Sequence, residues 1–130
     1  MKYLFLMSGA EGLWNDAERR DCMVESLKIC DELAAQKKFI ATAPLQPATT
    51  AATVRVRDGR PLVTDGPFAE TTEQLGGYFV LDLADLDEAI AVAARLPSVR
   101  MGKGIAEIRP MLALDGAPPS WWRSREEPSP

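Results

Sequence analysis

The first third of the chain predicts a strand, a helix and a second strand. Residues 2–8 are almost continuously apolar, which is typical of a central strand buried on both faces. Asn15 and Glu18 then form a capping-box pattern, which predicts a helix running to about Lys37. The apolar positions that recur along this helix at spacings of three and four residues are Met23, Leu27, Cys30 and Ala34. A strand is predicted over residues 39–45.

The clearest alternation of polar and apolar residues lies between residues 52 and 64. Asp58-Gly59 is a preferred pair in type I′ turns, so this segment predicts a β-hairpin. A two-residue turn sets a register that pairs Arg57 with Arg60, Arg55 with Leu62, and Thr53 with Thr64. Val54 and Val63 then share the opposite face of the hairpin.

The second half of the chain predicts a strand, a helix and a final strand. Residues 76–83 have the composition of a strand, and Asp85 is the expected N-cap of a helix that ends before Pro97. The expected buried stripe of this helix consists of Leu86, Ala89, Ile90, Ala93 and Ala94. Residues 105–111 are expected to form the last strand.

This order of elements is the βαββαβ pattern of a ferredoxin-like α+β sandwich with an inserted β-hairpin, here over residues 1–112. Two helices cover one sheet face, so the other face is left open. If it carries Tyr3, Phe5, Met7, Tyr78 or their neighbours, it is a large apolar patch, and we therefore predict a homodimer. Residues 113–130 form a proline-rich tail, in which Trp121 and Trp122 either dock on the body or a partner or belong to a disordered end.

Charge and composition narrow the possible functions. The 130 residues include 15 basic and 19 acidic side chains and no histidine, for a net charge of −4. The acidic balance argues against nucleic acid as a partner, and no apolar run reaches the roughly 18 residues of a membrane span. The first seven residues are too short for a secretion signal, so we expect a cytoplasmic protein. Without histidine, zinc–histidine sites and Ser-His-Asp or Cys-His catalysis are excluded.

The two cysteines predict neither a disulfide nor a metal site. Cys22 and Cys30 fall in one helix, about 12 Å apart, whereas a disulfide needs Cα atoms within about 7 Å. Reduced core thiols are the expected state. We expect no bound metal and no organic cofactor, because ligand clusters and glycine-rich phosphate loops are missing from the sequence.

Several ordered motifs make the chain resemble a known family. They are ATVR at residues 52–55, DG at 58–59, VTDGPFAET at 63–71, EQLGGY at 73–78, LDEA at 86–89 and EIRP at 107–110. The sequence resembles the YCII-related family and, within it, the DGPF branch. The resemblance implies a ferredoxin-like fold, small homo-oligomers and, for some members, an association with sigma-factor systems. It also implies a histidine–aspartate pair proposed as an active site, of which this chain lacks the histidine.

The candidate site lies around the hairpin. Arg55, between Thr53 and Thr64, offers bidentate donors for a carboxylate or another oxyanion; the alternative is an internal ion pair with Asp65 or Glu70. Asp65 is either a turn residue or a catalytic base, and with Glu70 it could form a paired-carboxylate site. Because Asp65 directly follows Thr64, we expect it within roughly 7 Å of Arg55. Phe68 and Trp14 either wall an apolar pocket or pack in the core.

Three functional hypotheses follow from these residues. The first is binding of a small organic molecule, including one that carries a carboxylate, in a cleft near the hairpin formed by Thr53, Arg55, Thr64, Asp65, Phe68 and Glu70. The second is an enzyme of hydrolytic or acid–base type that uses Asp65 on a small substrate. The third is a protein-interaction module linked to transcriptional regulation.

Overall fold

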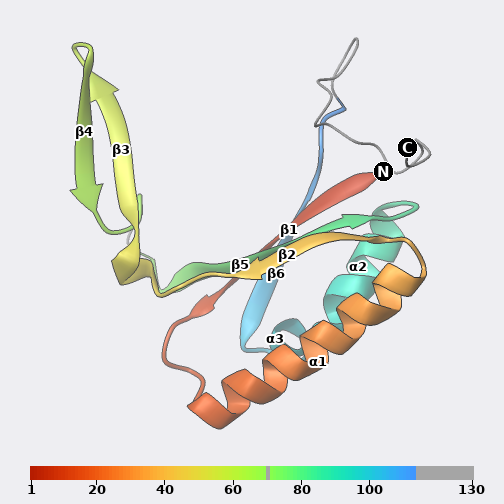
Figure 1. Cartoon of the computed structure of the whole chain (residues 1–130). Helices are drawn as coiled ribbons and strands as arrows, with labels where there is room; N and C mark the ends of the chain where they lie inside the picture. The colour runs from red at the N-terminus through yellow and green to blue at the C-terminus, as the bar shows by residue number, and fades with distance from the viewer. Residues whose placement is uncertain (70, 114–130) are drawn as a thin grey trace.

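The computed structural model describes residues 1–69 and 71–113, and its main sheet carries helices on one face (Figure 1). This antiparallel sheet has the order β2-β5-β1-β6, and β3 and β4 form a separate two-stranded sheet. The strands are β1 (Lys2–Ala10), β2 (Phe39–Pro44), β3 (Ala52–Arg57), β4 (Arg60–Asp65), β5 (Glu73–Asp82) and β6 (Gly104–Pro110). The helices are α1 (Asp16–Ala35), η1 (Ala48–Thr50), α2 (Leu86–Arg95) and α3 (Pro97–Arg100). The predicted ferredoxin-like α+β fold is confirmed, with α3 as an added turn after Pro97.

The core fills the space between the sheet and the helices. Phe5 is fully buried, and Tyr3 is 4% exposed. Because Phe5 pairs directly with Phe79, both side chains point to the helix-covered face. Of the residues considered for the uncovered face, Tyr3, Phe5 and Met7 therefore belong to the helix-covered face, and Tyr78 and the neighbours Leu4 and Leu6 lie on the uncovered one. The alternating positions on the uncovered face include Leu4, Leu6, Tyr78 and Val80, which are half-buried.

The two predicted helix stripes are also partly wrong. In α1 the buried residues are Ile29, Cys30 and Leu33, whereas Met23 and Leu27 are about half exposed. Because α1 has 20 residues, it spans about 30 Å, and its N-terminal half extends past the packed core (Figure 1). In α2 the buried residues are Ala89, Val92 and Ala93, while Leu86, Ile90 and Ala94 are exposed. The buried face of this helix is therefore formed by two alanines and Val92.

The hairpin β3–β4 projects from the body and is called the arm below (Figure 1). Its register pairs Thr53 with Thr64 and Arg55 with Leu62, as predicted. Asp58 and Gly59 have φ angles of 52° and 75°, which are the positive values of a type I′ turn. Both cysteines are free thiols. None of the helices in residues 1–69 and 71–113 is both long and apolar enough to cross a lipid bilayer.

Candidate functional site

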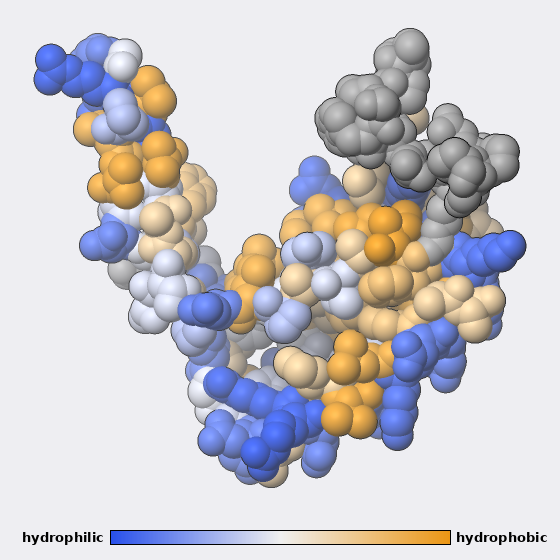
Figure 2. Space-filling view, in the orientation of Figure 1, coloured by the Kyte–Doolittle hydropathy of each residue, from blue (hydrophilic) through white to orange (hydrophobic). Residues whose placement is uncertain are grey.

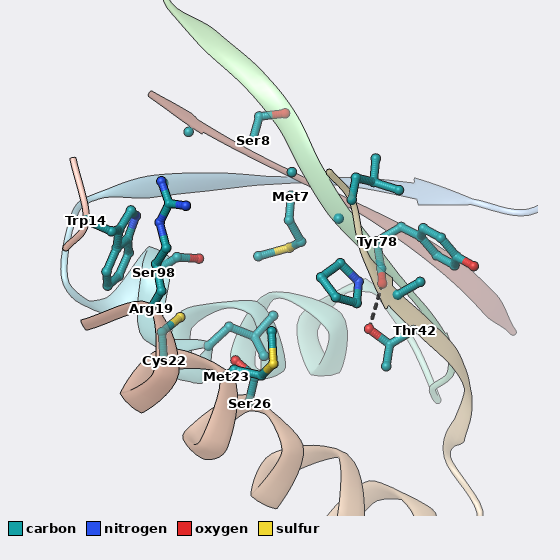
Figure 3. Close-up of a pocket in the computed structure, with 18 of the residues that line it drawn as sticks. Met7, Ser8, Trp14, Arg19, Cys22, Met23, Ser26, Thr42, Tyr78 and Ser98 are labelled. Carbon is teal, nitrogen blue, oxygen red and sulfur yellow. Dashed lines mark hydrogen bonds between the residues drawn. The ribbon is translucent and has the colours of Figure 1, made fainter. Parts of the chain in front are cut away.

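A cavity of about 470 Å³ lies where the N-terminal half of α1 passes over the ends of β1 and β2 (Figure 3). Small-molecule pockets typically have about 300–1,000 Å³. The cavity is lined by residues from α1, β1, β2 and β5 and from the segments around α3 and before β6. Gln46, Pro47 and Gln74 extend the lining toward the base of the arm.

The interior of the cavity is mostly apolar. Met7 projects from β1 into the space above α1, opposite Met23 (Figure 3). Leu27, Phe79 and Leu96 are further apolar residues of the lining. Met23 and Leu27 belong to the stripe that periodicity assigned to the core, and they border this cavity instead. Methionine side chains are flexible and polarisable, which suits a wall that adapts to a flat ring.

One end of the cavity is built by the first turn of α1. The Asn15 side chain accepts a bond from the Glu18 backbone N–H at 2.8 Å, and the Glu18 carboxylate accepts one from the Asn15 N–H at 3.1 Å. This capping box confirms the predicted helix start. Glu18 also accepts a bond from the Lys103 ammonium at 2.6 Å. The Lys103 ammonium and the Asn15 N–H hold the pKa of Glu18 below its usual value.

Two cations lie at this end, and they differ in their partners. Lys103 is paired with Glu18, and its nitrogen lies 4.6 Å from the centroid of the Trp14 ring. Arg19 lines the cavity, and its side chain rises from α1 beside Trp14 (Figure 3). Among the ion pairs within residues 1–69 and 71–113, none includes Arg19. The lining holds three charged side chains, Glu11, Arg19 and Lys103, and of the two cations Arg19 is the one without an ion pair in the described part of the chain.

The remaining polar groups of the cavity are thiols, hydroxyls, the amides of Gln46 and Gln74, and the Glu11 carboxylate, which accepts a bond from the Ala48 backbone N–H at 2.7 Å. Burial raises the pKa of the Cys22 and Cys30 thiols above their usual value, so both are protonated near neutral pH. Ser26 and Ser98 lie near Cys22 (Figure 3), and Thr42 donates a bond to the Tyr78 carbonyl at 2.8 Å. Groups of three or more acidic or cysteine side chains that could hold a metal ion do not occur in the described part of the chain.

The residues predicted to form the site lie on the arm and the turn that follows it. Thr53 faces Thr64 across the hairpin, and its hydroxyl donates a bond to the Gly66 carbonyl at 2.9 Å. The guanidinium carbon of Arg55 lies 5.3 Å from the centroid of the Phe68 ring. None of the lining residues of the cavity comes from this group. Its ligand-binding role therefore stays a prediction.

The expected proximity of Arg55 and Asp65 is not supported by the register. Asp65 pairs with Ala52, so its side chain points to the face of the arm opposite Arg55. The ion pairs of residues 1–69 and 71–113 do not join the two. Glu70, the other half of the predicted carboxylate pair, lies outside the described residues, as do Trp121 and Trp122.

Comparison with known proteins identifies the family. The model of the YCII-related domain matches residues 1–114. The chain belongs to the YCII-related family. An uncharacterised protein of Rhizobium meliloti (strain 1021) is 42% identical over 87 residues, which are 62% of this chain and 70% of that protein. Membership in the DGPF branch stays a prediction.

A solved structure resembles this YCII-related chain in fold. It is the 5-chloro-2-hydroxyhydroquinone dehydrochlorinase TftG from Burkholderia phenoliruptrix AC1100, in complex with 2,5-dihydroxybenzoquinone. The TM-score is 0.53 at 15% sequence identity, covering 86% of this chain and 94% of the enzyme. At this identity the likeness supports the ferredoxin-like fold and nothing finer.

Proposed function

We propose that this YCII-related protein binds a small, flat organic anion, such as an aromatic carboxylate or a phenolate, in the cavity beside α1. The ring lies between Met7 on the sheet and Met23 on the helix, and the anionic group meets Arg19. The observation that carries this proposal is the Arg19 guanidinium, which lacks an ion pair in the described part of the chain and borders a mostly apolar cavity. Guanidinium groups bind carboxylates through two parallel hydrogen bonds.

The chemistry of the lining favours binding over covalent catalysis. The two thiols are protonated near neutral pH, and a protonated thiol is a poor nucleophile. The chain has no histidine to serve as a general base. An enzymatic role for Asp65 remains the alternative, and it requires the ligand to reach the arm. A role as an interaction module in transcriptional regulation is a further alternative.

Two further considerations support a small aromatic ligand. The volume of about 470 Å³ suits a molecule with one or two rings. TftG, which has the same fold, was solved with the single-ring compound 2,5-dihydroxybenzoquinone. For our chain this is an analogy of fold and ligand size, and it assigns no reaction.

Titration calorimetry with a matched set of probes tests the proposal. Benzoate supplies a ring and a carboxylate, benzyl alcohol supplies the ring alone, and acetate supplies the carboxylate alone. We expect benzoate to bind at least tenfold more tightly than either of the other two. Arg19→Gln should weaken benzoate binding at least tenfold, which corresponds to about 1.4 kcal/mol.

Arg55→Gln is the matched control, because Arg55 is the arginine of the site predicted around the arm. It should leave benzoate binding unchanged. Arg19 lies in the first turn of α1, where the helix dipole disfavours a cation, so Arg19→Gln should not lower the melting temperature. Loss of binding in Arg55→Gln with normal binding in Arg19→Gln would place the ligand at the arm and refute the cavity.

A further inference from the structure

The cavity beside α1 has a negative group at the end near the base of the arm. Glu11, which directly follows β1, lines the cavity, and its Oε1 accepts a bond from the Ala48 backbone N–H at 2.7 Å. Ala48 follows Pro47, which belongs to the lining at the base of the arm. This bond holds the Glu11 carboxylate at that end of the cavity, whereas Arg19 lies in the first turn of α1.

The two groups have no partner of opposite charge. Within residues 1–69 and 71–113, none of the ion pairs includes Glu11 or Arg19, so the two are not paired with each other either. Figure 2 shows hydrophilic side chains over the start of α1, below the base of the arm, beside an apolar surface further along the helix. A ligand that contacts both groups therefore breaks no existing ion pair of either one.

The amides at the arm end of the cavity add hydrogen-bond acceptors to the Glu11 carboxylate. Gln46 and Gln74 line this end. The Gln74 Nε2 donates a bond to the Thr71 carbonyl at 2.7 Å, so the oxygen of this amide remains as an acceptor. An ammonium group has only donors, so it is the chemical match for a carboxylate beside amide oxygens.

We propose that the acid bound in this cavity is a zwitterion, with an ammonium group at Glu11 opposite the carboxylate that Arg19 binds. The inference rests on the proposed function, because it takes the carboxylate at Arg19 from it. It goes further by naming the ligand class, which is a ring-bearing amino acid. A simple anion is the weaker candidate, because it is repelled by Glu11 and leaves this carboxylate without a partner. A zwitterion compensates both groups at once.

Titration calorimetry with three probes of similar shape tests the inference. In 4-(aminomethyl)benzoate an ammonium group lies opposite the carboxylate, 4-(hydroxymethyl)benzoate carries an uncharged hydroxyl in its place, and benzoate lacks both. We expect the wild-type protein to bind 4-(aminomethyl)benzoate at least tenfold more tightly than either of the other two. Because the preference comes from charge, it should shrink in high salt.

Glu11→Gln removes the charge and keeps an oxygen that can accept the Ala48 N–H, so the variant should melt like the wild type. It should bind 4-(aminomethyl)benzoate at least tenfold more weakly, while benzoate binds as well as before or more tightly. Glu73→Gln is the matched control, because Glu73 pairs with Ala10, next to Glu11, and does not line the cavity. It should change the affinity for each probe less than twofold.

The probes separate this inference from the proposed function. If the wild type binds benzoate as tightly as 4-(aminomethyl)benzoate, the zwitterion is refuted and the proposed function stands. An equal loss of binding in Glu11→Gln and Glu73→Gln also overturns the inference, because the effect then comes from the overall charge of the protein. If only 4-(aminomethyl)benzoate binds and depends on Glu11, the inference stands and the simple anion is wrong. If neither probe binds, both proposals fail.

Discussion

Lys103 and Arg19 lie at the same end of the cavity, but they differ in their ion pairing. Lys103 is held by Glu18 at 2.6 Å, and Glu18 is itself held by the backbone of Asn15. Because Lys103 forms an ion pair with Glu18, its positive charge is already partly neutralised in the absence of a ligand. Arg19, one residue after Glu18, lines the cavity and has no ion pair within residues 1–69 and 71–113. The ion pair between Glu18 and Lys103 therefore makes Arg19 the stronger candidate for binding the anionic group of a ligand.

Replacing Glu18 should therefore change the charge of the cavity. Glu18→Gln removes the carboxylate that pairs with Lys103 and leaves a second cation near the ligand. We expect benzoate to bind two- to fivefold more tightly in titration calorimetry, with an effect that shrinks in high salt. Glu25→Gln is the control, because Glu25 lies on the same helix and pairs with Arg100 at 2.7 Å. Equal affinities in Glu18→Gln and wild type would show that Lys103 does not act on the ligand.

The thiols in the cavity should react slowly. Burial raises the pKa of Cys22 and Cys30, so the thiolate fraction at pH 7.4 is smaller than in an exposed cysteine. Iodoacetamide labelling followed by mass spectrometry should be slower at both positions than in a cysteine-containing peptide, and should accelerate above pH 9. Saturating benzoate should slow labelling of Cys22 further. Labelling of Cys22 as fast as the peptide at pH 7.4 would contradict the assigned environment.

At the scale of elements, the two main helices begin with similar capping contacts. Glu88, in the first turn of α2, accepts a bond from the Ala84 backbone N–H at 3.1 Å and from Lys38 at 3.0 Å. These contacts hold its pKa below the usual value, with the Ala84 N–H as the larger cause. The pKa of Glu18 is also below its usual value, because of its bonds with the Lys103 ammonium and the Asn15 N–H. Each helix start is therefore stabilised by an ionised carboxylate.

This arrangement predicts a specific dependence of stability on pH. Because the folded pKa values of Glu18 and Glu88 lie below the usual 4.5, the unfolded chain binds more protons in this range. Their contribution is present above pH 4.5 and is lost as the pH falls through the folded pKa values. The double variant Glu18→Gln/Glu88→Gln should therefore show a smaller drop in melting temperature between pH 6 and pH 3.5 than the wild type. An identical drop would mean that other carboxylates control acid unfolding.

At the scale of the whole molecule, the open sheet face and the arm make the isolated chain an incomplete layer structure. An α+β sandwich buries one face of its sheet beneath helices, and the other face must be polar or covered. Here that face carries Leu4, Leu6 and Val80 beside the ion pair of Glu107 and Arg109, and the arm adds its valines. The homodimer predicted from the order of elements remains a prediction.

A dimer should make stability depend on protein concentration. Mass action stabilises an assembly when its subunits become more abundant. For a dimer of this size, raising the concentration from 1 to 100 µM should raise the melting temperature by about 6 °C. Differential scanning fluorimetry at four concentrations measures the effect. A melting temperature that is constant across this range would exclude a dimer coupled to folding.

Features that depend on residues close together in the sequence could be predicted without the structure. The register of the arm follows from the Asp58-Gly59 turn, because a two-residue turn leaves one pairing that keeps Val54 and Val63 on the same face. The start of α1 follows from the Asn15–Glu18 pattern, because a capping box closes within four residues. The order of strands and helices then limits the chain to few topologies, which is why the ferredoxin-like fold could be predicted without coordinates. The family resemblance came separately, from the ordered motifs between residues 52 and 110.

The position and lining of the cavity could be seen only in the tertiary structure. Met23 and Leu27 have the spacing of core residues, and only the position of α1 relative to the sheet shows that they border a cavity. Lys103 pairs with Glu18 across 85 residues of sequence, so no local pattern could show that Arg19, and not Lys103, is the cavity cation without an ion pair in the described part of the chain. Helical periodicity reports that a face is apolar, because apolar side chains avoid water. Whether that face meets a core, a ligand or a second copy of the chain depends on which distant surfaces the fold brings opposite it.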